Sequence, residues 1–127
     1  TGIDFALPAI RLARKKASQE GLQIDFRLAD VTRPPQFDGP FDFILDIGCF
    51  HGLPPKSRSR YIQNIERLLA PQGTFLMYAF LKKPEDICIG IVESDIQMIT
   101  SHLRLIHRED SSERGLRPSA WFTFQKP

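Results

Sequence analysis

Apolar and polar residues alternate along the chain with two different periods, which predict strands separated by helices. Residues 1–4 have the pattern of the end of a strand. Residues 8–20 then place apolar side chains at helical spacing up to Gly21, which ends the predicted helix. Residues 23–30 alternate apolar and polar side chains, which is typical of a strand with one buried face. The segment 31–40 is rich in proline and aspartate, so we expect a loop there.

The middle of the chain predicts two buried strands with a helix between them. Residues 41–48 form a nearly continuous apolar run, as in a central parallel strand that is covered on both faces. A helix is expected from about 57 to 70, with Ser57 as its N-cap. The segment Pro71-Gln72-Gly73 ends that helix and turns the chain into another buried strand at 74–80.

The last third of the chain predicts, in order, an irregular loop at 81–90, a short helix at 92–101, a strand at 103–109, a turn-rich connection at 112–119 and a terminal strand at 120–126. Together the elements predict the α/β class, with a doubly wound, Rossmann-like sheet that is mostly parallel and has an antiparallel last strand. Because no strand and no glycine-rich turn precede residues 1–4, we expect this sheet to lack its first strand.

Composition narrows the class of protein. A chain of 127 residues with 42% hydrophobic and 25% charged residues fits one globular domain. The net charge of +2 is too small to indicate a nucleic-acid partner, and no apolar run is long enough to span a membrane. The cysteines and histidines lack the spacings of metal sites, so we expect no metal ion and a cytoplasmic protein. The basic residues Lys56, Arg58 and Arg60 are expected on a solvated helix face.

Acidic residues end the first three predicted strands. Asp4, Asp30 and Asp46 lie at these ends, and ligands of open α/β sheets bind beyond the carboxyl ends of the strands. A carboxylate has two acceptor oxygens, so one such residue can hold both hydroxyls of a ribose while the next accepts from the amine of adenine. The same residues also fit the role of caps for a helix or a turn, and from the residues alone both interpretations stay open.

Several segments, in chain order, resemble motifs of the class I S-adenosylmethionine-dependent methyltransferases. They are GIDFALPAIRLARKKA, LADVTRPP, FDFILDIGCFHGLPP, ERLLAPQGTFLMYAF and SAWFTFQK. Within this superfamily, the run D-x-G-C-F-H followed by P-x-x-R-x-x-Y resembles the small-molecule methyltransferases of the thiopurine and thiol type. The resemblance implies S-adenosylmethionine as cofactor and a small-molecule methyl acceptor. From the charge and the apolar runs, we expect neither a nucleic acid nor a membrane as partner.

The resemblance assigns the adenosine half of the cofactor to the ends of the first two strands. Asp4 would hold the ribose hydroxyls, and Phe5 beside it would contact the face of the adenine. Asp30 would accept a hydrogen bond from the adenine amine, with the backbone N–H of Val31 near the ring.

The third strand end is implied to serve the reacting end of the cofactor. Asp46 and Ile47 would lie beside the methionine portion and the sulfonium, mainly through backbone groups, while Phe50 and His51 would line the route to the acceptor. His51 is the candidate general base for a thiol or amine, because its usual pKa lies near neutrality. A histidine that only packs in a loop is the alternative, since positioning supplies most of the catalysis of methyl transfer.

Two departures from the family pattern set further expectations. The first strand and its GxGxG loop are absent, which predicts a single, N-terminally truncated domain over residues 1–127. Strands left without their neighbour expose unpaired edges, so a homodimer through these edges is expected. The usual Gly-Gly turn appears as Gln72-Gly73, a mild change at a turn that needs one permissive residue. A non-catalytic methyltransferase-like module for binding or assembly, or another α/β nucleotide binder, remains an alternative to the enzyme.

Overall fold

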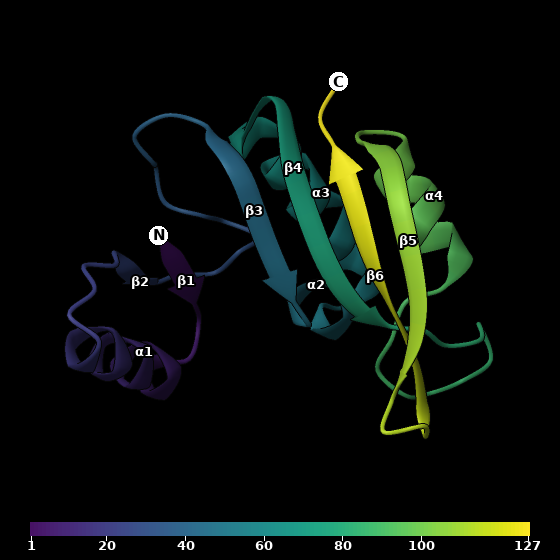
Figure 1. The fold of residues 1–127 in the computed structure, drawn as a ribbon. Helices are drawn as coiled ribbons and strands as arrows, with labels where there is room; N and C mark the ends of the chain where they lie inside the picture. Colours follow the sequence, from purple (N-terminus) through teal and green to yellow (C-terminus); the bar gives the residue numbers. More distant parts are fainter. The chain divides into compact units, whose positions relative to one another are not determined.

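The computed structural model describes all of residues 1–127, which form two compact units, Thr1–Phe37 and Asp38–Pro127 (Figure 1). The N-terminal unit contains β1 (Gly2–Asp4), α1 (Leu7–Gln19) and β2 (Phe26–Leu28). The two strands pair in parallel.

The helix of the N-terminal unit follows the sequence pattern closely. Ile10 and Ala17 are the buried positions of α1, Pro8 lies in its first turn, and Gly21 adopts a positive φ of 67° just beyond its end. The strand β2 is shorter than the predicted segment 23–30, because its partner β1 offers only three residues for pairing. The alternation of apolar and polar side chains in the sequence therefore extends beyond the residues of β2 that pair with β1.

The C-terminal unit contains a four-stranded sheet with the order β3-β4-β6-β5. Its strands are β3 (Phe41–Ile47), β4 (Leu69–Phe80), β5 (Arg104–Glu113) and β6 (Arg117–Gln125). β4 is parallel to β3, and β6 is antiparallel to both β4 and β5. Three strands therefore run in one direction and the last strand in the other, which confirms the predicted mixed sheet.

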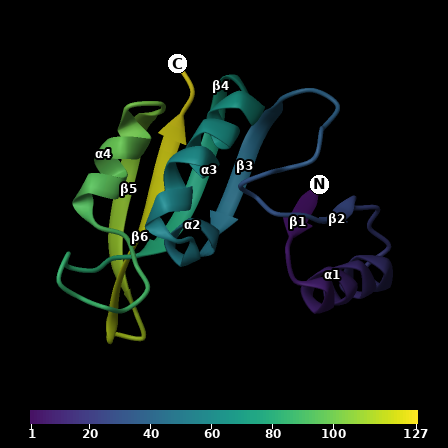
Figure 2. The ribbon, with the colours of Figure 1, turned by 180° about the vertical axis from the view of Figure 1, so that it is seen from behind.

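Three helices cover one face of this sheet, namely α2 (Cys49–Gly52), α3 (Pro55–Leu68) and α4 (Glu93–Thr100) (Figure 2). The core lies between the helices and the two central strands, β4 and β6, and is made of buried apolar side chains. On the strands these are Phe75, Met77, Ala79, Ala120, Phe122 and Phe124; on the helices they are Tyr61, Ile62, Ile65, Ile96 and Ile99. The edge of the Tyr61 ring meets Phe75, and Phe75 stacks on Phe124 at 6.0 Å between ring centroids.

The prediction that residues 41–48 form a strand covered on both faces is wrong for this unit. β3 pairs with β4 alone, and its residues Phe43, Leu45 and Ile47 are 53%, 51% and 65% exposed. The helices cover one face only, so every second side chain of β3 lies on the open face. A continuous apolar run indicates two apolar faces but does not say what covers each of them.

Several boundaries also differ from the expectation. β5 continues to Glu113 and β6 begins at Arg117, so most of the predicted connection 112–119 is strand. α3 begins at Pro55 with Pro54 as its N-cap, so Ser57 lies inside the first turn, where its N–H donates to the carbonyl of Pro54. β4 begins at Leu69 and continues through the predicted turn, where Gln72 adopts a positive φ of 63° and the register against β3 shifts.

Candidate functional site

The carboxylates of Asp4 and Asp30 lie at one edge of the N-terminal sheet. Asp4 ends β1 opposite Leu28 in the parallel register, and Asp30 follows just beyond the end of β2. The backbone N–H of Ala29 donates to the carbonyl of Asp4 at 2.9 Å, which joins the two chain segments at this edge. The carboxyl ends of two neighbouring parallel strands therefore bring both acids to the side where ligands of such sheets bind.

Each of these carboxylates also stabilises its own turn. Asp4 Oδ1 accepts a hydrogen bond of 2.7 Å from the N–H of Ala6, the N-cap of α1. Asp30 Oδ1 accepts from the N–H and the hydroxyl of Thr32, both at 2.8 Å. Both carboxylates thus cap their turns. At Asp4 the capping hydrogen bond occupies only Oδ1, so Oδ2 is left as an acceptor for a ligand.

The two residues that follow these acids differ in exposure. The ring of Phe5 is 84% exposed, although a large apolar side chain normally avoids water. Val31 is half-buried. An exposed ring next to a carboxylate, on the edge where ligands bind, has the chemistry needed to contact an adenine face while the acid holds ribose hydroxyls.

The third acid, Asp46, is buried in the C-terminal unit and is 3% exposed. Its Oδ1 accepts from the N–H of Cys49 at 2.7 Å, and its Oδ2 accepts from the N–H of Phe50 at 3.0 Å and the hydroxyl of Tyr61 at 2.8 Å. Burial raises the pKa of Asp46, and the three hydrogen bonds oppose that rise. The side chain thus holds the start of α2 in place, while Ile47 after it is 65% exposed.

His51 lies in α2 and packs on the end of β4. Its Nδ1 accepts a hydrogen bond of 3.0 Å from the backbone N–H of Phe80, and its ring stacks on that of Phe80 with 4.6 Å between centroids and 19° between planes. The Arg117 guanidinium lies 3.8 Å from the centroid of the Phe80 ring. Partial burial lowers the pKa of His51, and the charges of Arg117 and Arg58 lower it further.

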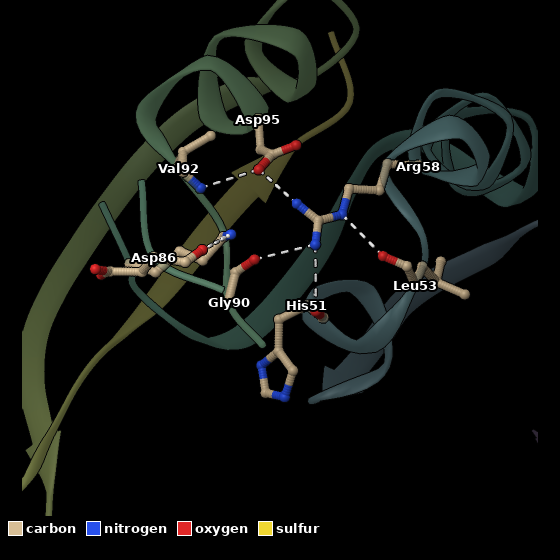
Figure 3. Close-up of polar contacts among 8 residues, drawn as sticks. His51, Leu53, Arg58, Asp86, Gly90, Val92 and Asp95 are labelled. Carbon is tan, nitrogen blue, oxygen red and sulfur yellow. Dashed lines mark hydrogen bonds and ion pairs between the residues drawn. The ribbon is translucent and has the colours of Figure 1, made fainter. Parts of the chain in front are cut away.

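Arg58 contradicts the expectation of a solvated basic residue, because it is 6% exposed and binds four groups (Figure 3). Its Nη1 pairs with Asp95 Oδ2 at 2.6 Å. Its other nitrogens donate to the carbonyls of Leu53 at 3.2 Å, His51 at 3.2 Å and Gly90 at 3.0 Å. The sequence signal was the P-x-x-R-x-x-Y spacing, which places Arg58 and Tyr61 on one face of a helix.

A pocket of about 510 Å³ lies among the segments that follow β3 and β4. His51, Lys82, Ser94 and Asp95 are among its polar lining residues. Its apolar lining includes Leu53, Pro54, Ile87, Ile89 and Val92. An apolar pocket of this size with a few convergent polar groups is the usual form of a small-molecule site.

Two structural findings bear on the remaining expectations. No three or more His, Cys, Asp or Glu side chains are gathered where they would hold a metal ion. Every helix of the structure is too short or too polar to cross a membrane.

The strand order and the helices packed on the sheet define an α/β protein of the Rossmann-like class. The sequence profile described as "Methyltransferase domain" matches residues 1–73, more than half of the chain. The chain therefore belongs to the methyltransferase domain family, within the class I superfamily whose cofactor is S-adenosylmethionine.

Individual relatives agree with this membership. The 2-heptyl-1-hydroxyquinolin-4(1H)-one methyltransferase of Mycobacteroides abscessus is 37% identical over 89 residues, which cover 68% of this chain and 39% of that enzyme. The demethylmenaquinone methyltransferase of Thermus thermophilus is 32% identical over 84 residues, covering 66% and 37%. The matched part of the chain thus spans well under half the length of these two relatives.

Among solved structures, the N-methyltransferase NodS of Bradyrhizobium japonicum WM9 in complex with S-adenosyl-L-homocysteine is similar, with a TM-score of 0.81 and 19% identity. The similarity covers 98% of this chain and 65% of NodS, and it concerns the fold. The Rossmann-like α/β prediction is thereby confirmed.

Proposed function

We propose that this chain is the part of a methyltransferase that binds the adenosine of S-adenosylmethionine and presents a small-molecule nucleophile for methylation. The observation that carries this proposal is the pair of carboxylates, Asp4 and Asp30, at the carboxyl ends of two parallel strands in register. Membership in the methyltransferase domain family supports it.

The residues present suit the adenosine half of the cofactor. Asp4 Oδ2 is the acceptor for ribose hydroxyls, the exposed ring of Phe5 packs against adenine, and Asp30 with Val31 serves the amine edge of the base. In the C-terminal unit, the backbone at Asp46 and Ile47 is the candidate contact for the methionine portion. When bound, the cofactor supplies a methyl group on a positively charged sulfur, which is a strong electrophile.

The acceptor side is assigned to the pocket after β3 and β4. Its size fits a small molecule, and its apolar walls with few polar groups suit an apolar acceptor with one nucleophilic atom. The relatives that act on a hydroxyquinolone and on demethylmenaquinone support a small-molecule acceptor as the substrate class.

Calorimetric titration of the chain with S-adenosylhomocysteine tests the adenosine site. We expect saturable binding that Asp4→Ala weakens at least tenfold, because a hydrogen bond to a charged group is typically worth about 1.5–3 kcal/mol. Asp38→Ala is the matched control, since Asp38 is an exposed acid beyond the sheet of the N-terminal unit. A folded chain that binds no S-adenosylhomocysteine, or equal affinity of the Asp4→Ala variant, would contradict the proposal.

A further inference from the structure

We propose that His51 donates a hydrogen bond to an acceptor that is already ionised, so that the substrates are small apolar molecules carrying a weakly acidic hydroxyl or thiol. This inference rests on the proposed methyltransferase function and names the substrate class of the pocket after β3 and β4. It replaces the role of general base that the sequence suggested for His51.

The first step is the tautomer of the imidazole. The backbone N–H of Phe80 donates to His51 Nδ1 at 3.0 Å, so this nitrogen carries a lone pair and no hydrogen. In a neutral imidazole the hydrogen is then on Nε2. Neither nitrogen is left to take a proton from a substrate: Nδ1 is occupied by β4, and Nε2 already holds a hydrogen.

The second step is where Nε2 lies. It has no hydrogen-bond partner, and since no side-chain nitrogen of the protein is buried without one, Nε2 reaches solvent. A Cβ placed on Gly48 would lie 3.2 Å from Nε2, which locates this atom directly over the carboxyl end of β3. Gly48 has a φ of 86°, so the chain turns there under the ring. Nε2–H is therefore a donor at the strand end where ligands bind.

The third step is the charge around the ring. Arg117 from β6 and Arg58 from α3 act on His51 and disfavour its cationic form. Lys82 from the segment after β4 lines the same pocket, as does Asp95 of α4, whose charge is paired with Arg58. Asp46, below α2, is occupied by its own three donors. A neutral donor in positive surroundings stabilises an anionic oxygen or sulfur more than a neutral one.

These features define the chemistry of the acceptor. The proton of the hydroxyl or thiol leaves to water, and the resulting anion rests on Nε2–H with its lone pair available for the methyl carbon. The apolar lining, including Leu53, Ile87 and Ile89, covers the rest of the molecule. Amines and aliphatic alcohols, which do not give an anion near neutral pH, fall outside this class.

Two measurements on the 127-residue chain test the inference without turnover. Nitrogen-15 NMR of the His51 ring reports the tautomer, and we expect the neutral Nε2–H form at neutral pH. Titration with 4-nitrophenol, whose phenolate absorbs visible light, reports which form binds. We expect the phenolate to bind preferentially, so that bound 4-nitrophenol ionises at a lower pH than it does free in solution.

A pair of variants isolates the donor. His51→Gln and His51→Phe both lose Nδ1 as an acceptor for Phe80, but only glutamine restores an N–H near the position of Nε2. We expect His51→Gln to keep the preference for phenolate and His51→Phe to weaken phenolate binding about tenfold. Thermal unfolding of both variants shows whether they are equally folded.

Three results would overturn the inference: an Nδ1–H or doubly protonated ring, phenolate binding by His51→Phe equal to that of the native chain, or no preference of the native chain for the phenolate. S-adenosylhomocysteine titrations on the same samples separate this from the proposed function. If the native chain binds S-adenosylhomocysteine but shows no preference for phenolate, only the inference about His51 is rejected. If the folded native chain binds no S-adenosylhomocysteine, the proposed function is rejected.

Discussion

The guanidinium of Arg58 and the carboxylate of Asp95 lie 2.6 Å apart, with side chains only 7% and 13% exposed. The same guanidinium binds the carbonyls of His51 and Gly90, and Asp95 Oδ2 also accepts from the N–H of Val92 at 2.9 Å. One ion pair therefore links α3, the start of α4 and the segments after β3 and β4 that line the pocket.

Removing one partner of this pair should destabilise the C-terminal unit strongly, because the other is left as a buried charge. We expect Arg58→Ala and Asp95→Ala each to cost about 3 kcal/mol of unfolding free energy, measured by urea titration. Arg60→Ala is the control, since Arg60 lies on the exposed face of the same helix and should change stability by less than about 0.5 kcal/mol. Equal effects of Arg58→Ala and Arg60→Ala would show that the ion pair contributes nothing.

Asp46 should make the unfolding free energy depend on pH in an unusual direction for a carboxylate. Its pKa in the folded protein is raised above its usual value of 3.8, so the folded state binds the proton more tightly than the unfolded state. The stability from Asp46 is therefore complete below pH 3.8 and is lost as the pH rises through the raised pKa. Urea unfolding of the native chain and Asp46→Asn, at pH values on both sides of this window, should show their difference in stability falling as the pH rises. A difference that does not change with pH would contradict this prediction.

His51 should contribute in the opposite sense. Its pKa in the folded protein is below its usual value of 6.5, so its contribution is complete above pH 6.5 and is lost as the pH falls through the lowered pKa. His51→Gln, which cannot titrate, should lose less stability than the native chain over this range. The chemical shift of the His51 ring against pH gives the folded pKa directly, and a midpoint at or above 6.5 would refute the prediction.

The turn at Gln72 and Gly73 offers a matched pair of substitutions with opposite effects. Gln72 has a φ of 63°, which strains a residue with a Cβ, so Gln72→Gly should stabilise the fold by up to about 1 kcal/mol. Gly73 has little room, since a Cβ there would lie 2.8 Å from the carbonyl oxygen of Ala70, so Gly73→Ala should destabilise by about 1–3 kcal/mol. Thermal denaturation of both variants measures the two signs, and a stabilising Gly73→Ala would overturn the argument.

Self-association through the free edge of β3 remains a prediction. β3 stands at the end of the strand order β3-β4-β6-β5, and its open face carries the exposed residues Phe43 and Leu45. Light scattering should show a molar mass that rises with concentration and returns toward the monomer in the variant Phe43→Lys/Leu45→Lys. A chain that stays monomeric at all concentrations would rule this interface out.

The helices α1, α3 and α4 and most strands followed from local periodicity, as Ile10 and Ala17 of α1 show, because the spacing of apolar residues depends on the chain segment alone. The four-residue helix α2 was not predicted. The environment of Arg58 did not follow, because its partners come from segments distant in sequence, and a basic residue on a helix is usually solvated. The faces of β3 were misjudged for the same reason: burial depends on what packs against a strand.

For the candidate site, the strand-end positions of Asp4 and Asp30 were predictable, since Asp4 ends one short strand and Asp30 lies just beyond another. The hydrogen bonds that Asp46 accepts, and the one that fixes the tautomer of His51, could not be predicted from the sequence. They depend on how α2, Tyr61 and the end of β4 approach one another in three dimensions. Residue types thus indicated where ligands bind, while the chemical role of each side chain required its neighbours.

The position of β6 has a consequence for how the C-terminal unit forms. Because β6 lies between β4 and β5 and bonds to both, those two strands have no direct hydrogen bonds to each other. Without residues 117–125 the sheet would consist of two separate pieces, and the buried ring of Phe75 would lack Phe124, on which it stacks. β6 therefore joins the two parts of the core, and a chain that lacks it would expose the apolar side chains of β4.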